Sequence, residues 1–207
     1  MINVLVVEDS KITQNTIERL LSSQKVFSIK AIIENAANAE IACLSGNIDL
    51  VLMDVCTADG ESGLLAAKNI KLHYPKIKVI IMTSMPEHSF IRKAKDYGCD
   101  SFWYKDYGNT DLVDVCLRTM KNESVWPQDI PVIPIGLTDS TELTEKEYEI
   151  IKNLSLGLKY DEIAEQMGIT VNTVKYHVKN LLQKTGYRNA LQLTVNVIDK
   201  RLILPKY

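Results

Sequence analysis

Five short apolar runs, each followed by a helical pattern, constrain the first part of this chain to an alternating α/β fold. Short continuous runs of Val, Ile and Leu are typical of parallel strands that are buried on both faces. The apolar runs lie near 2–7, 28–33, 49–53, 77–82 and 100–104, and the helical patterns near 10–22, 37–45, 62–73, 86–96 and 109–120. The alternation predicts a doubly wound α/β domain over residues 1–121, built on a five-stranded parallel sheet.

Apolar residues recur at roughly helical spacing in the first and last of these helical patterns, while charged residues occupy the other positions. The apolar positions are Ile12, Ile17, Leu20 and Leu21 in the first pattern, and Leu112, Val115, Cys116 and Thr119 in the last. Such a stripe indicates a helix that packs on a core.

Charged residues stand at the ends of three of the predicted strands. Glu8 and Asp9 close the first, Asp54 the third, and Lys105 the fifth. Carboxyl ends of parallel strands meet at one edge of an open sheet, where ligands bind, so we expect these side chains to converge. Three acids repel one another, and a cation such as Mg²⁺, which keeps waters for an incoming phosphate, relieves that repulsion. A lone Asp at a strand end is more often a cap or turn residue; the convergence singles out Asp54.

Composition and charge exclude several classes of protein. The chain has 207 residues, 24 basic and 26 acidic side chains and 46% hydrophobic residues, which is typical of a soluble globular protein of one or two domains. No apolar stretch approaches the length of a membrane span, so we expect a cytoplasmic protein without a membrane partner. The four Cys lack CxxC spacing and the three His lie far apart, which favours reduced thiols over disulfides or a zinc site.

Residues 122–142 differ in composition from what precedes them. This segment contains three Pro and four acids and has no Lys or Arg. Such a composition predicts an extended linker.

From residue 143 to 207 the sequence pattern is helical only. Thr144 and Glu147 form a capping-box signature at the start of one helix, which Gly157 ends. Three further helices are predicted at Tyr160–Met167, from Thr170 to about Thr185, and near Asn189–Leu202. The tight turn at Gly168 between the second and third helices predicts a helix-turn-helix in a small all-α domain, with the third helix as the DNA-recognition helix.

The charge distribution supports a nucleic-acid role for this second domain. From Gly168 onward the charged residues are Lys175, Lys179, Lys184, Arg188, Lys200, Arg201 and Lys206 against Asp199 alone. A charge run by itself is usually a solvated helix face. Here it coincides with the predicted recognition helix, where neutralising phosphates would provide affinity for DNA.

Two sets of motifs in this chain resemble a known family. Glu8-Asp9, Asp54, Thr83 and Lys105 stand in the order and spacing of the receiver domain of two-component response regulators. The segments 157–164, 173–178 and 181–184 resemble the LuxR-type helix-turn-helix. Together they identify the chain as similar to the NarL/FixJ family of transcriptional regulators.

The resemblance implies roles for the residues at the strand ends. Asp54 would accept a phosphoryl group from a sensor histidine kinase. Asp9 and Asp54, with the main-chain carbonyl of Cys56, would bind Mg²⁺, and Glu8 would act through a metal-bound water. Lys105 would pair with the phosphoryl oxygens.

Two further receiver residues correspond to the family's switch. Thr83 would donate a hydroxyl hydrogen bond to the phosphoryl group, and Phe102 would move inward when Thr83 shifts. Taken alone, each is more often structural, Thr83 as a strand-end residue and Phe102 as core.

The same resemblance assigns residues of the third helix to DNA. Lys175, Tyr176 and Lys179 would lie at base-reading positions, on the side opposite to the inward stripe. The residues expected to contact the DNA backbone are Asn172, Thr173 and His177.

One departure from the family pattern lies just after Asp54. Thr57 and Ala58 stand where many receivers carry Met-Pro, and Asp59-Gly60-Glu61 follow. Loss of the proline is expected to loosen this loop, and the two added acids to alter Mg²⁺ affinity or the lifetime of the phosphate.

The sequence therefore favours a phosphorylation-gated transcription factor that binds two DNA half-sites as a homodimer formed on activation. One alternative is a receiver that acts through protein contacts and carries a vestigial helical domain. Another is an atypical regulator that is controlled by a partner or ligand without phosphorylation. We expect no enzymatic activity beyond self-phosphorylation and slow hydrolysis at Asp54, because no nucleotide-binding loop or catalytic triad is present.

Overall fold

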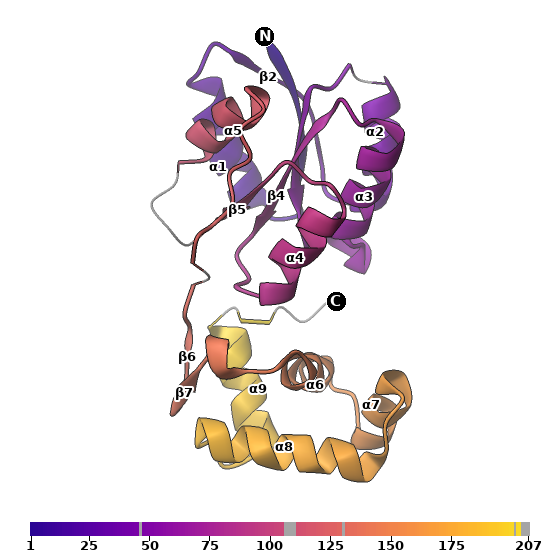
Figure 1. Ribbon diagram of the computed structural model, residues 1–207, viewed down its shortest axis with the longest axis vertical. Coiled ribbons are helices and arrows are strands. Elements are labelled where there is room, and N and C mark those ends of the chain that lie inside the picture. Colours follow the sequence, from indigo (N-terminus) through magenta and orange to yellow (C-terminus); the bar gives the residue numbers. More distant parts are fainter. Residues whose placement is uncertain (46, 106–110, 130, 201, 204–207) are drawn as a thin grey trace. The chain divides into compact units, whose positions relative to one another are not determined.

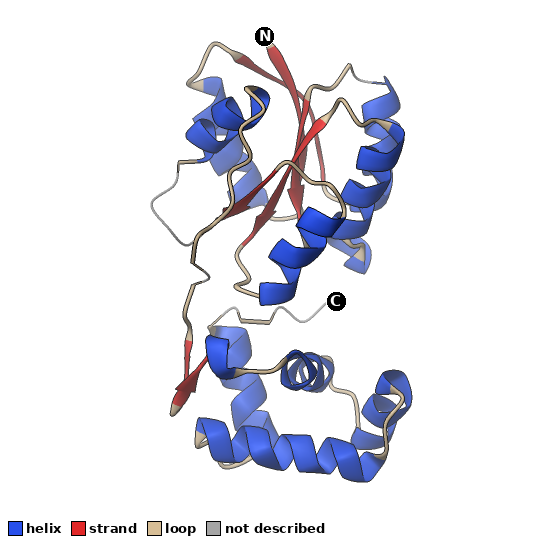
Figure 2. Ribbon diagram, in the orientation of Figure 1, coloured by secondary structure: helices blue, strands red, loops and turns tan. Residues whose placement is uncertain are grey.

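The structure is a computed structural model that describes residues 1–45, 47–105, 111–129, 131–200 and 202–203. It divides into two compact units, one formed by Met1–Ser84 and His88–Asp129 and the other by Met85–Glu87 and Ile130–Tyr207. The first unit is α/β, and the second is mainly helical (Figure 2). Among the described residues, no helix is both long and apolar enough to cross a membrane.

A five-stranded sheet forms the centre of the first unit. Its strands are β1 (Ile2–Val7), β2 (Phe27–Ile33), β3 (Leu50–Asp54), β4 (Lys78–Thr83) and β5 (Ser101–Tyr104). They run parallel in the order β2-β1-β3-β4-β5, so the chain winds first to one edge and then to the other. The predicted doubly wound parallel sheet is confirmed, and the switch point lies between β1 and β3.

Helices cover both faces of this sheet (Figure 1). On one face lie α1 (Lys11–Ser22) and α5 (Leu112–Met120), and on the other lie α2 (Ala39–Ser45), α3 (Gly63–His73) and α4 (His88–Asp96). Leu52 and Ile80 on one face of the sheet and Val51 and Ile81 on the other have no exposed surface, as expected for strands that are buried on both sides.

One apolar position predicted for α1 differs in the structure. Ile12 is 80% exposed, whereas Ile17 and Leu21 are buried and Leu20 is half-buried. Ile12 lies five residues before Ile17, which corresponds to about 140° around a helix, so the two cannot share one buried face. The buried stripe instead includes Gln14, which is 6% exposed.

Four helices build most of the second unit. They are α6 (Glu145–Ser155), α7 (Tyr160–Met167), α8 (Val171–Thr185) and α9 (Ala190–Asp199). The capping box of Thr144 and Glu147 is formed, and Gly168 and Gly186 end α7 and α8 in the left-handed conformation. The core of this unit includes one apolar residue or more from each of α6, α7 and α8, all of them buried: Tyr148, Ile163, Val174, Val178 and Leu181.

Part of the predicted extended linker is instead folded onto the second unit. An antiparallel pair, β6 (Pro134–Ile135) and β7 (Thr138–Asp139), precedes a 3-10 turn at Ser140–Glu142. At the tip of this hairpin, the Leu137 N–H donates to the carbonyl of Thr185, the last residue of α8, at 2.9 Å. The hairpin satisfies a carbonyl at a helix end that has no partner within the helix, and this explains its position.

Gly63 begins α3 at a point where the helix passes very close to the end of β3. A Cβ atom on Gly63 would lie 1.7 Å from the carbonyl oxygen of Asp54. The N–H of Gly63 also donates to the carbonyl of Val55 at 3.0 Å, which fixes this approach. Only a residue without a side chain fits here.

Gly63→Ala is therefore expected to destabilise the first unit by about 3 kcal/mol or more, because a methyl group cannot fit against a fixed main-chain oxygen. Chemical denaturation followed by circular dichroism measures the change. Gly98→Ala is the control: a Cβ there meets nothing within 4 Å, although its φ of +75° is left-handed. Its expected cost is only about 1–2 kcal/mol. Equal losses for the two variants would contradict the close approach.

Candidate functional site

Three carboxylates gather at the carboxyl edge of the sheet, as the strand ends predict. Carboxylate oxygens of Glu8, Asp9 and Asp54 lie within 4.8 Å of one another. Glu8 is 1% exposed and Asp54 is 6% exposed, whereas Asp9 is open to solvent. The cluster therefore combines two buried acids with one acid that faces water.

Lys105, the residue that follows β5, extends its side chain into this cluster. Its Nζ lies 3.0 Å from Oδ1 of Asp54 and 2.5 Å from Oε2 of Glu8. The Lys105 N–H donates to the carbonyl of Thr83 at 2.9 Å, and Thr83 ends β4 with 2% of its surface exposed. The adjacent ends of β4 and β5 thus bring Thr83 and Lys105 to the same edge as the acids.

The electrostatics of the cluster are dominated by burial. Burial raises the pKa of Asp54 to about 7, although the ammonium of Lys105 opposes this shift. Burial likewise raises the pKa of Glu8. Burial alone would lower the pKa of Lys105, but the attraction of Asp54 and Glu8 raises it above its ordinary value.

The charge balance suits a hard divalent cation. One lysine faces three carboxylates, so the ionised cluster carries an excess of negative charge in a mostly buried place. Oxygen ligands of this kind fit Mg²⁺, which is bound through one or two carboxylates and retains waters. The chain turns back immediately after Asp54, where Cys56 and Ser62 form an isolated antiparallel bridge. The main chain of Cys56 therefore lies in the loop that follows the cluster.

Two residues that sequence reasoning missed support Glu8. Ser10 caps α1 with its side chain, and its N–H donates to Oε1 of Glu8 at 3.1 Å. The buried Gln14 donates from Nε2 to the carbonyl of Glu8 at 2.6 Å. Ser10 could have been recognised as a helix cap. A signal for Gln14 also existed, because it is a polar residue at the helical spacing of Ile17 and Leu21.

The loop after Asp54 makes hydrogen bonds within itself and to a neighbouring loop. The Thr57 hydroxyl donates to the carbonyl of Glu61 at 2.9 Å and accepts from the N–H of Ala36 at 3.0 Å. The N–H of Ala58 donates to the carbonyl of Glu34 at 2.9 Å. The residues that stand where many receivers carry Met-Pro are therefore bonded to the loop that follows β2.

Phe102 lies within the core of the first unit. It is 1% exposed, and its ring meets that of Tyr104 edge to face with centroids 5.1 Å apart. It stands on β5 three residues before Lys105. The predicted switch aromatic is therefore in an inward position.

Helix α8 in the second unit carries the residues predicted to contact DNA. Lys175 and Lys179 are exposed, and Tyr176 is 62% exposed. Val174 and Val178, on the opposite side, are buried. The other predicted contacts are Asn172, which is exposed, and Thr173 and His177, which are half-buried.

Lys184 differs from the other lysines of this helix. Its Nζ lies 2.9 Å from Oε2 of Glu147 and 3.1 Å from the carbonyl of Glu142. The pairing joins the end of α8 to the capping box of α6. Lys184 therefore belongs to the internal packing of the unit and does not add to the basic face.

Comparisons with known proteins agree with this architecture. The model of the response regulator receiver domain matches residues 4–117, and that of the bacterial regulatory proteins of the luxR family matches residues 141–197. Response regulator protein VraR of Staphylococcus aureus is 32% identical over 209 residues, covering 98% of this chain and 99% of VraR.

Solved structures have the same fold. RcsB of Salmonella typhimurium matches with a TM-score of 0.58 and 19% identity, over 95% of this chain and 97% of RcsB. A complex of RcsB with DNA matches with a TM-score of 0.58 and 19% identity, over 96% and 98% of the two chains.

The raised pKa of Asp54 generates a prediction for stability. Without metal, the folded state holds this proton up to about pH 7, whereas the unfolded chain releases it near pH 4. The folded state binds more protons in that window, so the free energy of unfolding should fall as the pH rises from 5 to 8. In EDTA at pH 8, Asp54→Asn should stabilise the chain by about 1–3 kcal/mol, because no buried charge forms.

Urea denaturation at pH 5, 6, 7 and 8 measures both effects. Glu18→Gln, a substitution on the exposed face of α1, is the control and should keep the slope of the parent. A free energy of unfolding that rises with pH in the parent, or no gain at pH 8 in Asp54→Asn, would contradict the assignment.

Proposed function

Because this chain belongs to the response regulators with a LuxR-type DNA-binding domain, we propose that phosphorylation of Asp54 by a sensor histidine kinase controls its binding to DNA and hence transcription. The observation that carries the proposal is the contact of Lys105 with Asp54 and Glu8 beside the exposed Asp9. A buried carboxylate nucleophile next to a fixed ammonium and two further acids is suited to phosphoryl transfer.

In this proposal an oxygen of Asp54 attacks the phosphorus of a phosphohistidine. The P–N bond breaks, the imidazole takes up a proton, and an aspartyl phosphate forms. Lys105, already 3.0 Å from Oδ1 of Asp54, pairs with a phosphoryl oxygen. Asp9, Asp54 and the Cys56 carbonyl would hold Mg²⁺, with Glu8 acting through a water. The charge of the ion offsets the repulsion between an anionic nucleophile and an anionic donor.

The phosphoryl group is then sensed by Thr83 and Phe102. The main-chain N–H of Lys105 donates to the carbonyl of Thr83. A shift of the end of β4 therefore moves the end of β5 with it, and both residues move together. The Thr83 hydroxyl donates to a phosphoryl oxygen, and Phe102, which is already buried, shifts further inward as Thr83 moves toward the phosphoryl group. Added charge at one edge thereby biases a two-state surface.

The exposed side of α8 enters the major groove in this proposal. Lys175 and Lys179 contact base edges, and Tyr176 packs against a thymine methyl. Asn172, Thr173 and His177 contact the DNA backbone. RcsB has been solved as two dimers bound to two parallel DNAs, and we propose that this chain likewise binds two half-sites as a homodimer.

Asp54 is expected to be the sole phosphoacceptor. Mg²⁺ and acetyl phosphate should add one phosphoryl group, seen by intact mass, and Asp54→Asn should remove it. Asp9→Ala should slow the reaction without lowering metal-free stability, because loss of one clustered acid relieves repulsion. A label that persists in Asp54→Asn would place the acceptor elsewhere. DNA binding that still responds to the kinase in this variant would favour control without phosphorylation.

Lys175→Ala and Lys179→Ala should each weaken DNA binding by about 1–3 kcal/mol and change base preference at particular positions. Fluorescence anisotropy on a duplex from a randomised-pool selection, repeated across salt concentrations, measures this. Affinity should fall steeply with salt, because binding releases counterions. Lys152→Ala, an exposed lysine of α6, is the matched control. An equal loss for Lys152→Ala would contradict the contact assignment.

A further inference from the structure

The chain that follows α5 turns back and lies against β5. Asn122 adopts a left-handed φ of 66°, and the residues after it reach the edge strand. The N–H of Phe102 donates to the carbonyl of Val125 at 2.9 Å, and the N–H of Val125 donates to Oγ of Ser101 at 2.9 Å. We call residues 122–126 the strap. It pairs with β5 at Phe102, the residue assigned to the switch.

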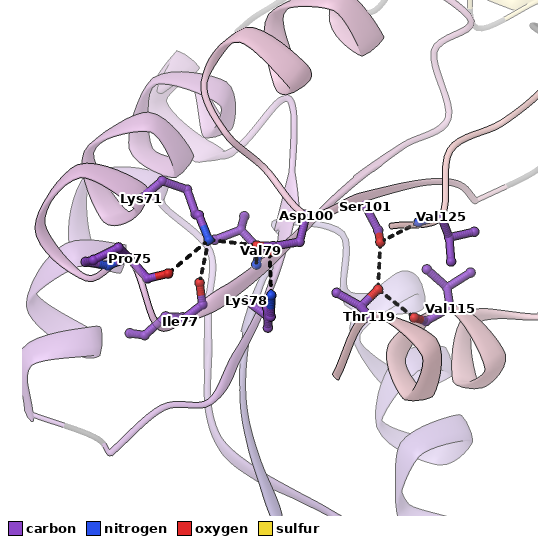
Figure 3. Close-up of polar contacts among 10 residues, drawn as sticks. All are labelled: Lys71, Pro75, Ile77, Lys78, Val79, Asp100, Ser101, Val115, Thr119 and Val125. Atoms are coloured by element: carbon purple, nitrogen blue, oxygen red, sulfur yellow. Dashed lines mark hydrogen bonds and ion pairs between the residues drawn. The ribbon is translucent and has the colours of Figure 1, made fainter. Parts of the chain in front are cut away.

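A chain of hydroxyl groups continues from the strap into α5 (Figure 3). Oγ of Ser101 lies 2.7 Å from Oγ1 of Thr119, which in turn donates to the carbonyl of Val115 at 2.7 Å. Each hydroxyl has one proton. Since Thr119 gives its proton to Val115, Ser101 must donate to Thr119 and accept from Val125. The strap therefore terminates a directed hydrogen-bond chain.

Side chains of the strap add to this contact. Val125 packs against the core cluster that contains Leu112 and Val115. The ring of Trp126, the last residue of the strap, lies under Nζ of Lys95 on α4, 5.0 Å from the ring centroid. Such a cation–π contact at an exposed site contributes modestly.

The start of β5, on which the strap lies, is anchored by charges (Figure 3). Asp100 accepts hydrogen bonds from Nζ of Lys71 at 2.8 Å, from Nζ of Lys78 at 2.9 Å and from the N–H of Val79 at 2.9 Å. The Lys71 and Asp100 side chains are only 13% and 15% exposed. The strap thus rests on a fixed strand end and can leave it without unfolding that end.

The far end of the linker is also attached. The β6–β7 hairpin donates to Thr185 through Leu137, and Nζ of Lys200 donates to the carbonyl of Pro134 at 2.5 Å. Within the second unit, the linker therefore ends at the carboxyl terminus of α8. The length of chain between the two attachment points depends on whether the strap is bound.

We infer that the strap is a length switch for the linker, and that phosphorylation releases it from β5 through Phe102. This inference rests on the proposed function, in which Phe102 responds to Asp54. With the strap bound, the chain from Val125 to Ile135 reaches at most about 35 Å. Release from β5 extends the free segment back to Glu123, whose N–H stays bonded to the Arg118 carbonyl of α5 at 3.0 Å, and allows about 42 Å.

The added reach has a direct consequence for DNA binding. Two recognition helices must lie about one helical turn apart on one duplex. A linker too short to span two sites prevents simultaneous binding, whereas a sufficient length permits it. When the strap is bound to β5, the shorter linker therefore restricts where the DNA-binding domains can lie. When the strap is released, the longer linker lets two of these domains occupy neighbouring half-sites.

Trp126 reports on the strap directly. The chain has two tryptophans, so Trp103→Phe leaves Trp126 as the only one. In this background the full chain is treated with Mg²⁺ and acetyl phosphate, and acrylamide quenching of Trp126 is measured before and after. The fraction phosphorylated is read by intact mass. Phosphorylation should raise the quenching constant and shift the emission to the red.

Two variants are expected to weaken the attachment of the strap without phosphorylation. Val125→Pro removes the N–H that donates to Ser101, and Thr119→Val removes a hydroxyl while keeping the shape of the side chain. Loss of these hydrogen bonds should shift the binding equilibrium of the strap by about tenfold. Asp129→Pro, beyond the strap, is the control for added proline and should quench like the parent. Thermal denaturation establishes that each variant is folded.

The outcomes separate the inference from the proposed function. Phosphorylated chain with unchanged Trp126 quenching, or folded Val125→Pro and Thr119→Val that both quench like the parent, would overturn the strap switch and leave the proposed function standing. A chain that takes up no phosphoryl group would overturn the proposed function, and with it the link to Asp54. Support requires more quenching on phosphorylation, and unphosphorylated Val125→Pro that binds a two-half-site duplex more tightly than Asp129→Pro.

Discussion

Two buried carboxylates share a single ammonium group in this protein, and the functional chemistry depends on that imbalance. Lys105 contacts both Asp54 and Glu8, yet burial still raises the pKa of both acids. One lysine therefore does not fully compensate the cluster, and any added positive charge, or a phosphoryl group that attracts Lys105, redistributes its interactions. A carboxylate that is poorly stabilised in its charged form is a site where binding of a cation and a change of ligand have large effects.

Much of this arrangement could be predicted from sequence, because it depends on local patterns. Short apolar runs place the strands, and the topology of a parallel sheet brings their carboxyl ends together. Glu8, Asp54 and Lys105 follow from that rule, as do the caps at Thr144 and Gly168. The wrong expectations have a different origin. Ile12 was assigned to the apolar stripe of α1 by approximate spacing. Its offset of about 140° from Ile17 places it on a different face of the helix.

Other features depend on tertiary hydrogen bonds that leave no pattern in sequence. Thr57 is hydrogen-bonded to the main chain of its own loop and of a neighbouring loop. The composition of residues 122–142 predicted an extended linker, whereas part of the segment forms the β6–β7 hairpin and a 3-10 turn. The attachments of this segment at Val125 and Leu137 use main-chain groups that every residue other than proline carries. Composition alone cannot report where such groups find their partners.

The strap is attached to β5, a short strand whose other end is followed by Lys105 of the acidic cluster. This strand therefore connects the cluster with the linker. β5 is four residues long, or about 13 Å. Lys105 follows one end, and Ser101, with the strap bonded to it, begins the other. On its inner side β5 pairs with β4, whereas on its outer side two hydrogen bonds join it to the strap. In the proposed switch, a small shift of Phe102 would disturb the strap before the sheet, because two hydrogen bonds join the strap to β5 whereas β5 pairs with β4 along its whole length.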